Sequence, residues 1–372
     1  MMLILWHAMS ETELSLPARK DLIREHQANG GMVAAVFPIH YPRELLRAHG
    51  VLPIEIWGPP GRDASAADRY LQAYTCSIVR GGMAFLQSGG LDAADLIVVP
   101  NPCDSLQGLG TVLLDFQVTD KPVLTVYNPR GGKRESALAY LADEFGVMAA
   151  HLGKITGRSP TDAELLEATQ REAHADALLA KLWQARTSIA LEDRDFYRLV
   201  RSREYLPVED FIALGERTLE GAGEPQTGRV PVVLSGLVPE PMSFLDIVSE
   251  AGAMIVADDC ACSGRRLYPE GDSELPLVRM AERILGASPC SMRGSPIQAR
   301  IDHLLDLATR TQSKAVIFFE VKFCEPEQFY LPLVRAGLGA AGVRSIVLEV
   351  DVTDTLPRQA ATRVEALLET LS

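Results

Sequence analysis

The sequence predicts an α/β protein with two Rossmann-like parallel-sheet domains and a helical insertion between them. Three observations support this prediction. Short apolar runs alternate with amphipathic stretches, which is the order of a parallel sheet with helical crossovers. Most of these runs are apolar throughout, as expected of strands that are covered on both faces. The stretch from residue 135 to residue 219 contains no convincing strand.

Residues 1–134 are expected to form the N-terminal α/β domain. Its strands are predicted at Met32–Phe37, Pro53–Trp57, Leu96–Pro100 and Val123–Tyr127. Helices are predicted at Pro42–His49 and Leu71–Arg80, because both stretches are amphipathic.

Residues 135–227 are expected to form the helical segment and a linker. A long helix is predicted over Thr161–Ala190, since Ser159, Pro160 and Thr161 offer a cap and acidic residues follow in the first turn. The linker is placed at residues 220–228, which contain four glycine or proline residues.

Residues 228–372 are expected to form the C-terminal α/β domain. Its strands are predicted at Val230–Leu234, Met254–Ala257, Ala315–Val321 and Ser345–Val350. Its helices are predicted at Pro241–Glu250, Ile297–Arg310 and Glu327–Leu338.

The charge balance argues against two classes of partner. The 372 residues carry 36 Lys and Arg against 49 Asp and Glu, a formal net charge of −13. Nucleic-acid binding needs a basic surface, and docking on anionic lipid needs a basic cluster. No secretory signal and no run of 18 apolar residues is visible, so we expect a cytoplasmic protein with neither nucleic acid nor membrane as partner. Its six cysteines are then expected as reduced thiols or metal ligands.

Three patches place cysteine directly after a predicted strand. They are Cys103 after Leu96–Pro100, Cys260 and Cys262 after Met254–Ala257, and Cys324 after Ala315–Val321. Ligands of open α/β sheets bind outside the carboxyl ends of the strands, so thiols from both domains can converge on one interdomain cleft.

These thiols allow more than one interpretation. Free cysteines are often small buried hydrophobes, although these lie in polar turns. A structural zinc site is disfavoured because the sequence has no Cys-x-x-Cys pair and the spacings are long. Thiolates gathered from distant loops suit an iron–sulfur cluster.

Five sequence patches occur in a fixed order along the chain. They are residues 37–53, Asn101–Leu109, Asp259–Arg266, Lys322–Pro326, and Glu349–Asp351 followed by Thr362–Ala366. In this order they resemble the 2-hydroxyacyl-CoA dehydratase and benzoyl-CoA reductase family, and the resemblance covers most of the chain.

The resemblance implies a cofactor, partners and a reaction. It implies a [4Fe-4S] cluster held by three cysteines, which match Cys76, Cys103 and Cys324; only the resemblance selects Cys76. It implies a heterodimer with a homologous second subunit, an acyl-CoA substrate, and an ATP-hydrolysing iron–sulfur activator protein that supplies one electron. In the dehydratases of the family, that electron makes a ketyl radical at the thioester carbonyl, and the radical lets a β-proton leave after loss of the hydroxyl. The expected function is therefore that of an iron–sulfur subunit of a radical-type 2-hydroxyacyl-CoA dehydratase.

Three alternatives remain open within this resemblance. One is a subunit of an ATP-dependent benzoyl-CoA-type reductase, in which electrons reduce the ring. The second is a double-cubane cluster reductase of a small molecule, for which Cys260, Cys262 and Cys290 are possible additional ligands. The third is a non-catalytic paralogue that serves as an electron relay.

Two residues near the first predicted strand are candidate catalytic groups. His40 either faces the substrate or carries a proton, or it is a surface or capping histidine. Glu44 is either a base or an ordinary acidic residue in the first turn of a helix.

Charged turns offer further candidates. Asp258 and Asp259 either position a base or bond to a cluster ligand, or they cap a turn. Arg265 and Arg266 either hold a CoA phosphate or offset cluster charge, or they are solvated turn arginines. Residues 129–134 combine glycines with three cations and either meet CoA phosphates or form an exposed turn.

Overall fold

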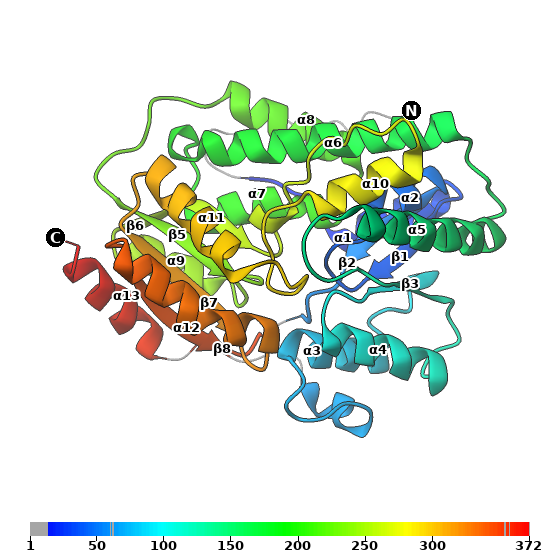
Figure 1. Cartoon of the computed structure of the whole chain (residues 1–372), viewed down its shortest axis with the longest axis horizontal. Coiled ribbons are helices and arrows are strands. Elements are labelled where there is room, and N and C mark those ends of the chain that lie inside the picture. Colours follow the sequence, from blue (N-terminus) through cyan, green and yellow to red (C-terminus); the bar gives the residue numbers. More distant parts are fainter. Residues whose placement is uncertain (1–13, 60, 62, 353–354, 357, 372) are drawn as a thin grey trace.

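Two four-stranded parallel sheets, one in each half of the chain, form the centre of the molecule (Figure 1). The computed structural model describes residues 14–59, 61, 63–352, 355–356 and 358–371. The first sheet contains β1 (Met32–Val36), β2 (Val51–Glu55), β3 (Leu96–Pro100) and β4 (Val123–Val126). The second contains β5 (Val230–Gly236), β6 (Ala253–Cys260), β7 (Ala315–Val321) and β8 (Arg344–Val350).

Both sheets have the same strand order. It is β2-β1-β3-β4 in the first sheet and β6-β5-β7-β8 in the second, with all pairs parallel. Their central strands are buried because they are apolar on both faces; Val33 and Val36, which point to opposite faces of β1, are each at most 1% exposed.

Helices cover both faces of the first sheet. They are α1 (Arg19–Ala28), α2 (Arg43–Ala48), α3 (Ser77–Gln87), α4 (Asp104–Asp115) and α5 (Glu135–Thr156), and a 3₁₀ helix, η1 (Ala64–Arg69), precedes α3. One face packs against α2 and α5 through residues such as Val36, Leu45 and Phe145. The opposite face packs against α3 and α4 through residues such as Val99, Met83 and Leu109.

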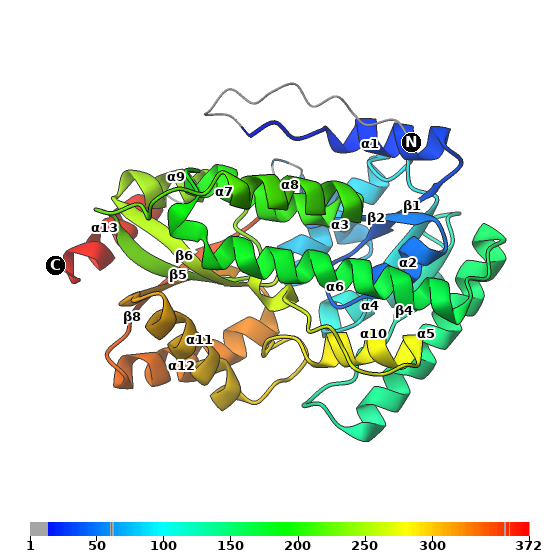
Figure 2. The ribbon, with the colours of Figure 1, turned by 90° about the horizontal axis from the view of Figure 1, so that it is seen from above.

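The middle of the chain is helical and belongs to both halves. It consists of α6 (Asp162–Gln184), η2 (Arg186–Ser188), α7 (Asp193–Arg201), η3 (Ser202–Glu204) and α8 (Val208–Glu220). Figure 2 shows α6 running along both halves of the molecule, and it contacts α2 at one end and β6 at the other. The helical segment also contains α5, which packs on β4 of the first sheet, whereas α7 packs on α9 (Ser243–Glu250) of the second half. Helices of this segment therefore pack against both halves of the molecule.

The second half interlocks with the first through α10 (Pro276–Leu285). This helix follows β6 and η4 (Gly264–Arg266), yet it packs on α5 and α6. The remaining helices are α11 (Ile297–Arg310), α12 (Glu325–Ala340) and α13 (Gln359–Glu369). No helix in the described ranges is long and apolar enough to cross a membrane.

The predicted fold class is confirmed, and all eight predicted strands are present. Several predicted boundaries are wrong. The long helix predicted over Thr161–Ala190 ends at Gln184, and the strand predicted over Pro53–Trp57 is Val51–Glu55. Residues 71–76 form turns, so α3 begins only at Ser77 and Cys76 is its N-cap rather than a residue inside a helix over Leu71–Arg80. The strand predicted to end at Ala257 continues to Cys260, because Ser235 and Gly236 of β5 extend the pairing to Asp259 and Cys260.

Candidate functional site

The strand order creates a switch point in each sheet. In the first sheet, β1 and β3 are central neighbours, and the next strand along the chain lies on opposite sides of them. In the second sheet, β5 and β7 are related in the same way. Open α/β sheets bind ligands at such points, outside the carboxyl ends of the strands. The fold therefore offers two candidate positions for a ligand-binding site, one in each sheet.

Both switch points open on a single small cavity. Pro38 and Ile39 follow β1, Cys103 follows β3, Leu237 follows β5, and Cys324 follows β7. We call this space the cysteine cavity, because three thiols line it. Its complete lining is Pro38, Ile39, Trp57, Cys76, Ile78, Val79, Cys103, Ser105, Leu106, Leu237, Met292, Cys324 and Pro326.

Each of the three thiols is the N-cap of a helix. Cys76 precedes α3, Cys103 precedes α4, and Cys324 precedes α12. Figure 1 shows the start of α12 close to α3 near the middle of the molecule. Helix N-termini carry unpaired N–H groups and the positive end of the helix dipole, so this placement favours negative charge on sulfur.

Burial acts in the opposite direction on these thiols. It raises the pKa of Cys76 and of Cys324, and it raises the pKa of Cys103 to about 12. The amides of Val79 and Ile78 partly offset this effect on the pKa of Cys76. Charge repulsion from Cys76 raises the pKa of Cys103, and repulsion from Cys76 and Cys103 raises that of Cys324, so all three thiols are protonated at neutral pH unless they bind a cation. A metal that binds them must displace these protons, because thiolate is the ligand form.

The donor set fits a cluster better than a single ion. No group of three or more His, Cys, Asp or Glu residues in the described part of the chain is placed to hold one metal ion. A cubane bonds each cysteine to a different iron, so its ligands stand further apart than those of one ion. The described residues that line the cavity include three thiols but no carboxylate and no imidazole group. Thiolates are soft donors, which suit an iron–sulfur cluster. The cavity has a volume of about 30 Å³, so side chains of its lining must shift to admit a cluster.

The other three cysteines lie elsewhere. Cys260 and Cys262 are buried, and burial raises the pKa of both thiols. The thiol group of Cys290 is also buried, and its backbone N–H donates to Ser295 Oγ at 3.0 Å. Cys260, Cys262 and Cys290 are absent from the described lining of the cysteine cavity.

His40 is a buried residue, so its interpretation as a surface histidine is wrong. It has φ of 61° and is 0% exposed, and its Nδ1 lies 3.3 Å from the hydroxyl of Tyr268. Burial first, and then the charges of Arg293, Arg266 and Arg265, hold the pKa of His40 well below its usual range. His40 is therefore neutral. It follows Ile39 of the cavity lining without lining the cavity itself.

Glu44 lies in a network of buried ion pairs. It accepts from Arg283 Nε at 3.2 Å, and Arg283 also donates to Asp176 of α6 at 2.7 Å. Burial raises the pKa of Glu44 despite the charge of Arg283. Glu44 is not among the described residues that line the cysteine cavity.

The arginines of η4 are buried, so their interpretation as solvated turn arginines is wrong. Arg266 donates to both carboxylate oxygens of Glu55 at 2.6 Å, and thereby joins the two halves. Arg265 donates to both carboxylate oxygens of Glu327 at 2.5 and 2.9 Å. A buried guanidinium group needs such partners because its desolvation is costly.

The two aspartates of β6 differ in pKa. The guanidinium groups of Arg265 and Arg300 hold the pKa of Asp259 well below its usual range despite its burial. Burial raises the pKa of Asp258 to about 6. Asp258 accepts hydrogen bonds from the hydroxyl of Tyr197 and from the backbone N–H of Gly264 at 2.6 Å, so it organises the turn after β6.

The basic segment at residues 129–134 forms a turn beside the cysteine cavity. Arg130 is exposed and pairs with Asp104, the first residue of α4. The N–H of Gly131 donates to the carbonyl of Arg293 at 2.8 Å. The segment is therefore an exposed turn, and its role in meeting CoA phosphates stays a prediction.

Several polar residues near the strand ends escaped the sequence analysis as individual candidates. The side-chain amide of Asn101 is buried and lacks a hydrogen-bond partner among the described residues. Burial raises the pKa of Glu320 to about 8, and one of its carboxyl oxygens has no described partner. A single carboxylate within the apolar run Ala315–Val321 was the available signal for Glu320.

Comparisons with known proteins identify similar chains over almost the whole length. The family model described as 2-hydroxyglutaryl-CoA dehydratase, D-component, matches residues 38–371. Lactoyl-CoA dehydratase subunit beta of Anaerotignum propionicum is 26% identical, covering 98% of this chain and 100% of that protein. (R)-phenyllactyl-CoA dehydratase beta subunit of Clostridium sporogenes is 26% identical over 95% of both chains. One benzoyl-CoA reductase subunit, from Thauera aromatica, is 24% identical over 81% of both chains.

Proposed function

Because the chain belongs to the family of the 2-hydroxyglutaryl-CoA dehydratase D-component, we propose that it is one subunit of a 2-hydroxyacyl-CoA dehydratase. Two of the similar proteins are dehydratase beta subunits, and each aligns over nearly its full length. The proposed reaction removes water from a 2-hydroxyacyl-CoA thioester after its one-electron reduction, and the electron is returned when the enoyl-CoA product forms, since the overall dehydration is redox-neutral.

The observation that carries the proposal is the convergence of Cys76, Cys103 and Cys324 on the cysteine cavity. They come from three separate helix N-termini, on both sheets, at both switch points. A [4Fe-4S] cluster bound by these three thiolates would supply single electrons at low potential.

The chain's own residues supply the environment for such chemistry. Ile39, Val79, Leu106 and Met292 line the cavity with apolar groups that exclude water. The amide groups at the starts of α3, α4 and α12 stabilise negative charge on the thiolates. Arg265 and Arg266 place two permanent cations in η4, shortly after the end of β6. Each is paired with a buried carboxylate.

The proposal includes partners and a location. The subunit names of the relatives support assembly with another subunit, which we propose to be a homologous chain in a heterodimer. An ATP-hydrolysing iron–sulfur activator would deliver the electron. We propose a cytoplasmic location, in which the six cysteines would remain reduced.

A ring reductase is the second candidate. It is supported by the similarity to the benzoyl-CoA reductase subunit over 81% of the chain. Turnover of a 2-hydroxyacyl-CoA against benzoyl-CoA, with partner subunit and activator present, separates the two functions.

The first experiment measures iron and acid-labile sulfide in protein purified without oxygen, with an EPR spectrum after dithionite. We expect about four iron atoms per chain. Replacing Cys76, Cys103 or Cys324 by Ala should remove most of the iron. The matched controls Cys262→Ala and Cys290→Ala should retain it.

Other outcomes of the iron measurement contradict the proposed site. Iron loss in the control variants, with about eight iron atoms in the parent chain, would favour the double-cubane reductase. No iron after reconstitution under reducing conditions would leave the non-catalytic paralogue as the better account.

A further inference from the structure

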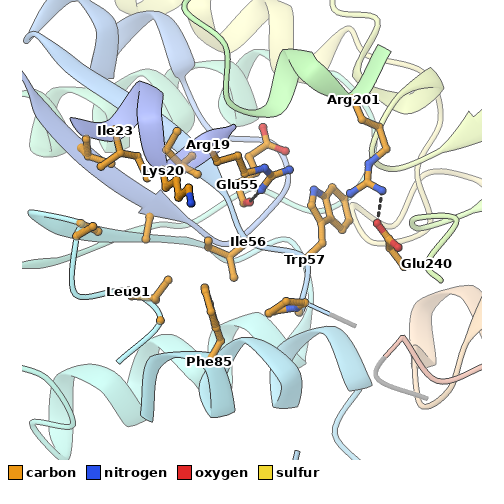
Figure 3. A pocket seen from close by; sticks show the side chains of 18 residues that line it. Arg19, Lys20, Ile23, Glu55, Ile56, Trp57, Phe85, Leu91, Arg201 and Glu240 are labelled. Carbon is orange, nitrogen blue, oxygen red and sulfur yellow. Dashed lines mark hydrogen bonds and ion pairs between the residues drawn. The ribbon is translucent and has the colours of Figure 1, made fainter. Parts of the chain in front are cut away.

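A second and larger cavity lies on the first sheet beside α1 and α3 (Figure 3). Its volume is about 500 Å³, within the range of small-molecule sites. We call it the sheet pocket. Val33 and Ala35 of β1 and Ile54 of β2 line it, together with Phe85 of α3 and Leu91. An apolar body of moderate length therefore fits this space.

Trp57 separates the sheet pocket from the cysteine cavity, since it lines both. Its side chain is 6% exposed, and its indole N–H has no acceptor among the described residues. A buried donor without an acceptor is costly, so an oxygen atom of a bound molecule would be favoured there. Figure 3 shows the indole group beside Glu55 and facing the wall that carries Arg19.

The charged groups of the pocket leave a net positive edge. Both carboxylates of the described lining are paired: Glu55 with Arg266, and Glu240 with Arg201. Arg19 donates to the carbonyl of Glu55 at 2.9 Å and to Glu204.

Lys20 differs from the paired charged residues at this edge of the pocket. It follows Arg19 on α1 and has no ion pair within the described ranges. Its ammonium group and the indole N–H of Trp57 are both donors. A ligand that satisfies them must present an acceptor, and a negative one is favoured by the charge of Lys20.

We propose that the sheet pocket binds an elongated apolar carboxylate, such as a medium-chain or arylalkyl acid. Its carboxylate lies on the side of Arg19, Lys20 and Trp57, and its apolar body lies along β1 and β2. The site needs no metal and no thioester, so it stands independently of the proposed function.

Calorimetry with decanoate tests this site on the full chain as purified, without added iron. We expect one binding site per chain and a Kd at least tenfold weaker for Lys20→Glu. The matched control Lys314→Glu carries the same charge change on an exposed lysine of the other half and should bind as the parent chain does. Trp57→Phe, which removes the N–H and keeps an aromatic ring, should also weaken binding.

Four results would overturn the assignment, and three of them come from direct binding. They are the absence of decanoate binding at millimolar concentration, equal binding by Lys20→Glu and Lys314→Glu, and equal binding of decyltrimethylammonium. Displacement of decanoate by decanoyl-CoA with the same affinity would show that the free carboxylate is not recognised, and would also overturn it. Cys103→Ala should keep the decanoate affinity, so this proposal and the iron–sulfur proposal fail separately.

Discussion

At the scale of single residues, burial is the main reason why His40 is neutral. The imidazole group is enclosed and faces three arginines, so its protonated form is disfavoured in the folded chain. In the unfolded chain the pKa returns to about 6.5. Between the two pKa values the unfolded state binds more protons, so the free energy of unfolding falls as pH falls below about 6.5.

Replacing His40 by Asn should flatten this acid dependence, because Asn does not titrate and tolerates the positive φ of this position. Urea midpoints measured from about pH 7.5 to about pH 5.5 compare the two chains. The parent chain should lose more stability over this interval than His40→Asn does. Parallel curves for the two chains would show that His40 titrates normally in the folded state.

The sequence predicted only some of the site at this scale. Cys103 and Cys324 were expected where they lie, because each follows an apolar strand. Cys76 follows no strand, and its place depends on where the turns at residues 71–76 end. The burial of Arg266 was beyond sequence reasoning, since its partner Glu55 lies 211 residues away.

At the scale of elements, the start of α6 depends on a capping box. The hydroxyl oxygen of Thr161 accepts from the N–H of Glu164 at 3.3 Å, and the carboxylate of Glu164 accepts from the N–H of Thr161 at 2.7 Å. The cap was predictable because both partners lie within one turn of sequence. The end of β6 was not, because it is set by β5, which lies on a different segment.

Thr161→Ala should lower the free energy of unfolding by about 1 kcal/mol, since it leaves the N–H of Glu164 without its acceptor. Thr161→Ser keeps the hydroxyl group and should stay within about 0.5 kcal/mol of the parent chain. Urea unfolding followed by circular dichroism measures both. Equal loss in the two variants would assign the effect to the methyl group of Thr161 instead of the cap.

At the scale of the whole molecule, buried ion pairs hold the halves together. Arg266 joins η4 to β2, and Arg283 of α10 joins α2 and α6. Together with the packing of α10 on α5, these pairs fix the relative position of the two sheets. The cysteine cavity depends on that position, because its thiols come from both halves.

Arg266→Met should destabilise the chain by about 3 kcal/mol or more, because Glu55 keeps Arg43 and Tyr41 but loses a bidentate partner in a buried site. The double variant Arg266→Met, Glu55→Gln should recover part of this loss, since no unbalanced carboxylate remains. The parent chain, Arg266→Met, Glu55→Gln and the double variant form a double-mutant cycle. The urea midpoint and slope of each give its free energy of unfolding. Additive losses would show that the two side chains do not depend on each other.

The shared strand order of the two sheets has a consequence for the positions of the cysteines. It lets β1 to β4 be matched one by one with β5 to β8. Cys103 and Cys324 then occupy equivalent positions, each after the third strand of its sheet. Cys76 lies between the second and third strands of the first sheet, and Cys290 lies in the same interval of the second.

The equivalence stops at this second pair. Cys290 does not line the cavity, and the thioether of Met292 lines it from that interval instead. The cavity is therefore asymmetric: the first half supplies two thiols, and the second half supplies one thiol and one methionine.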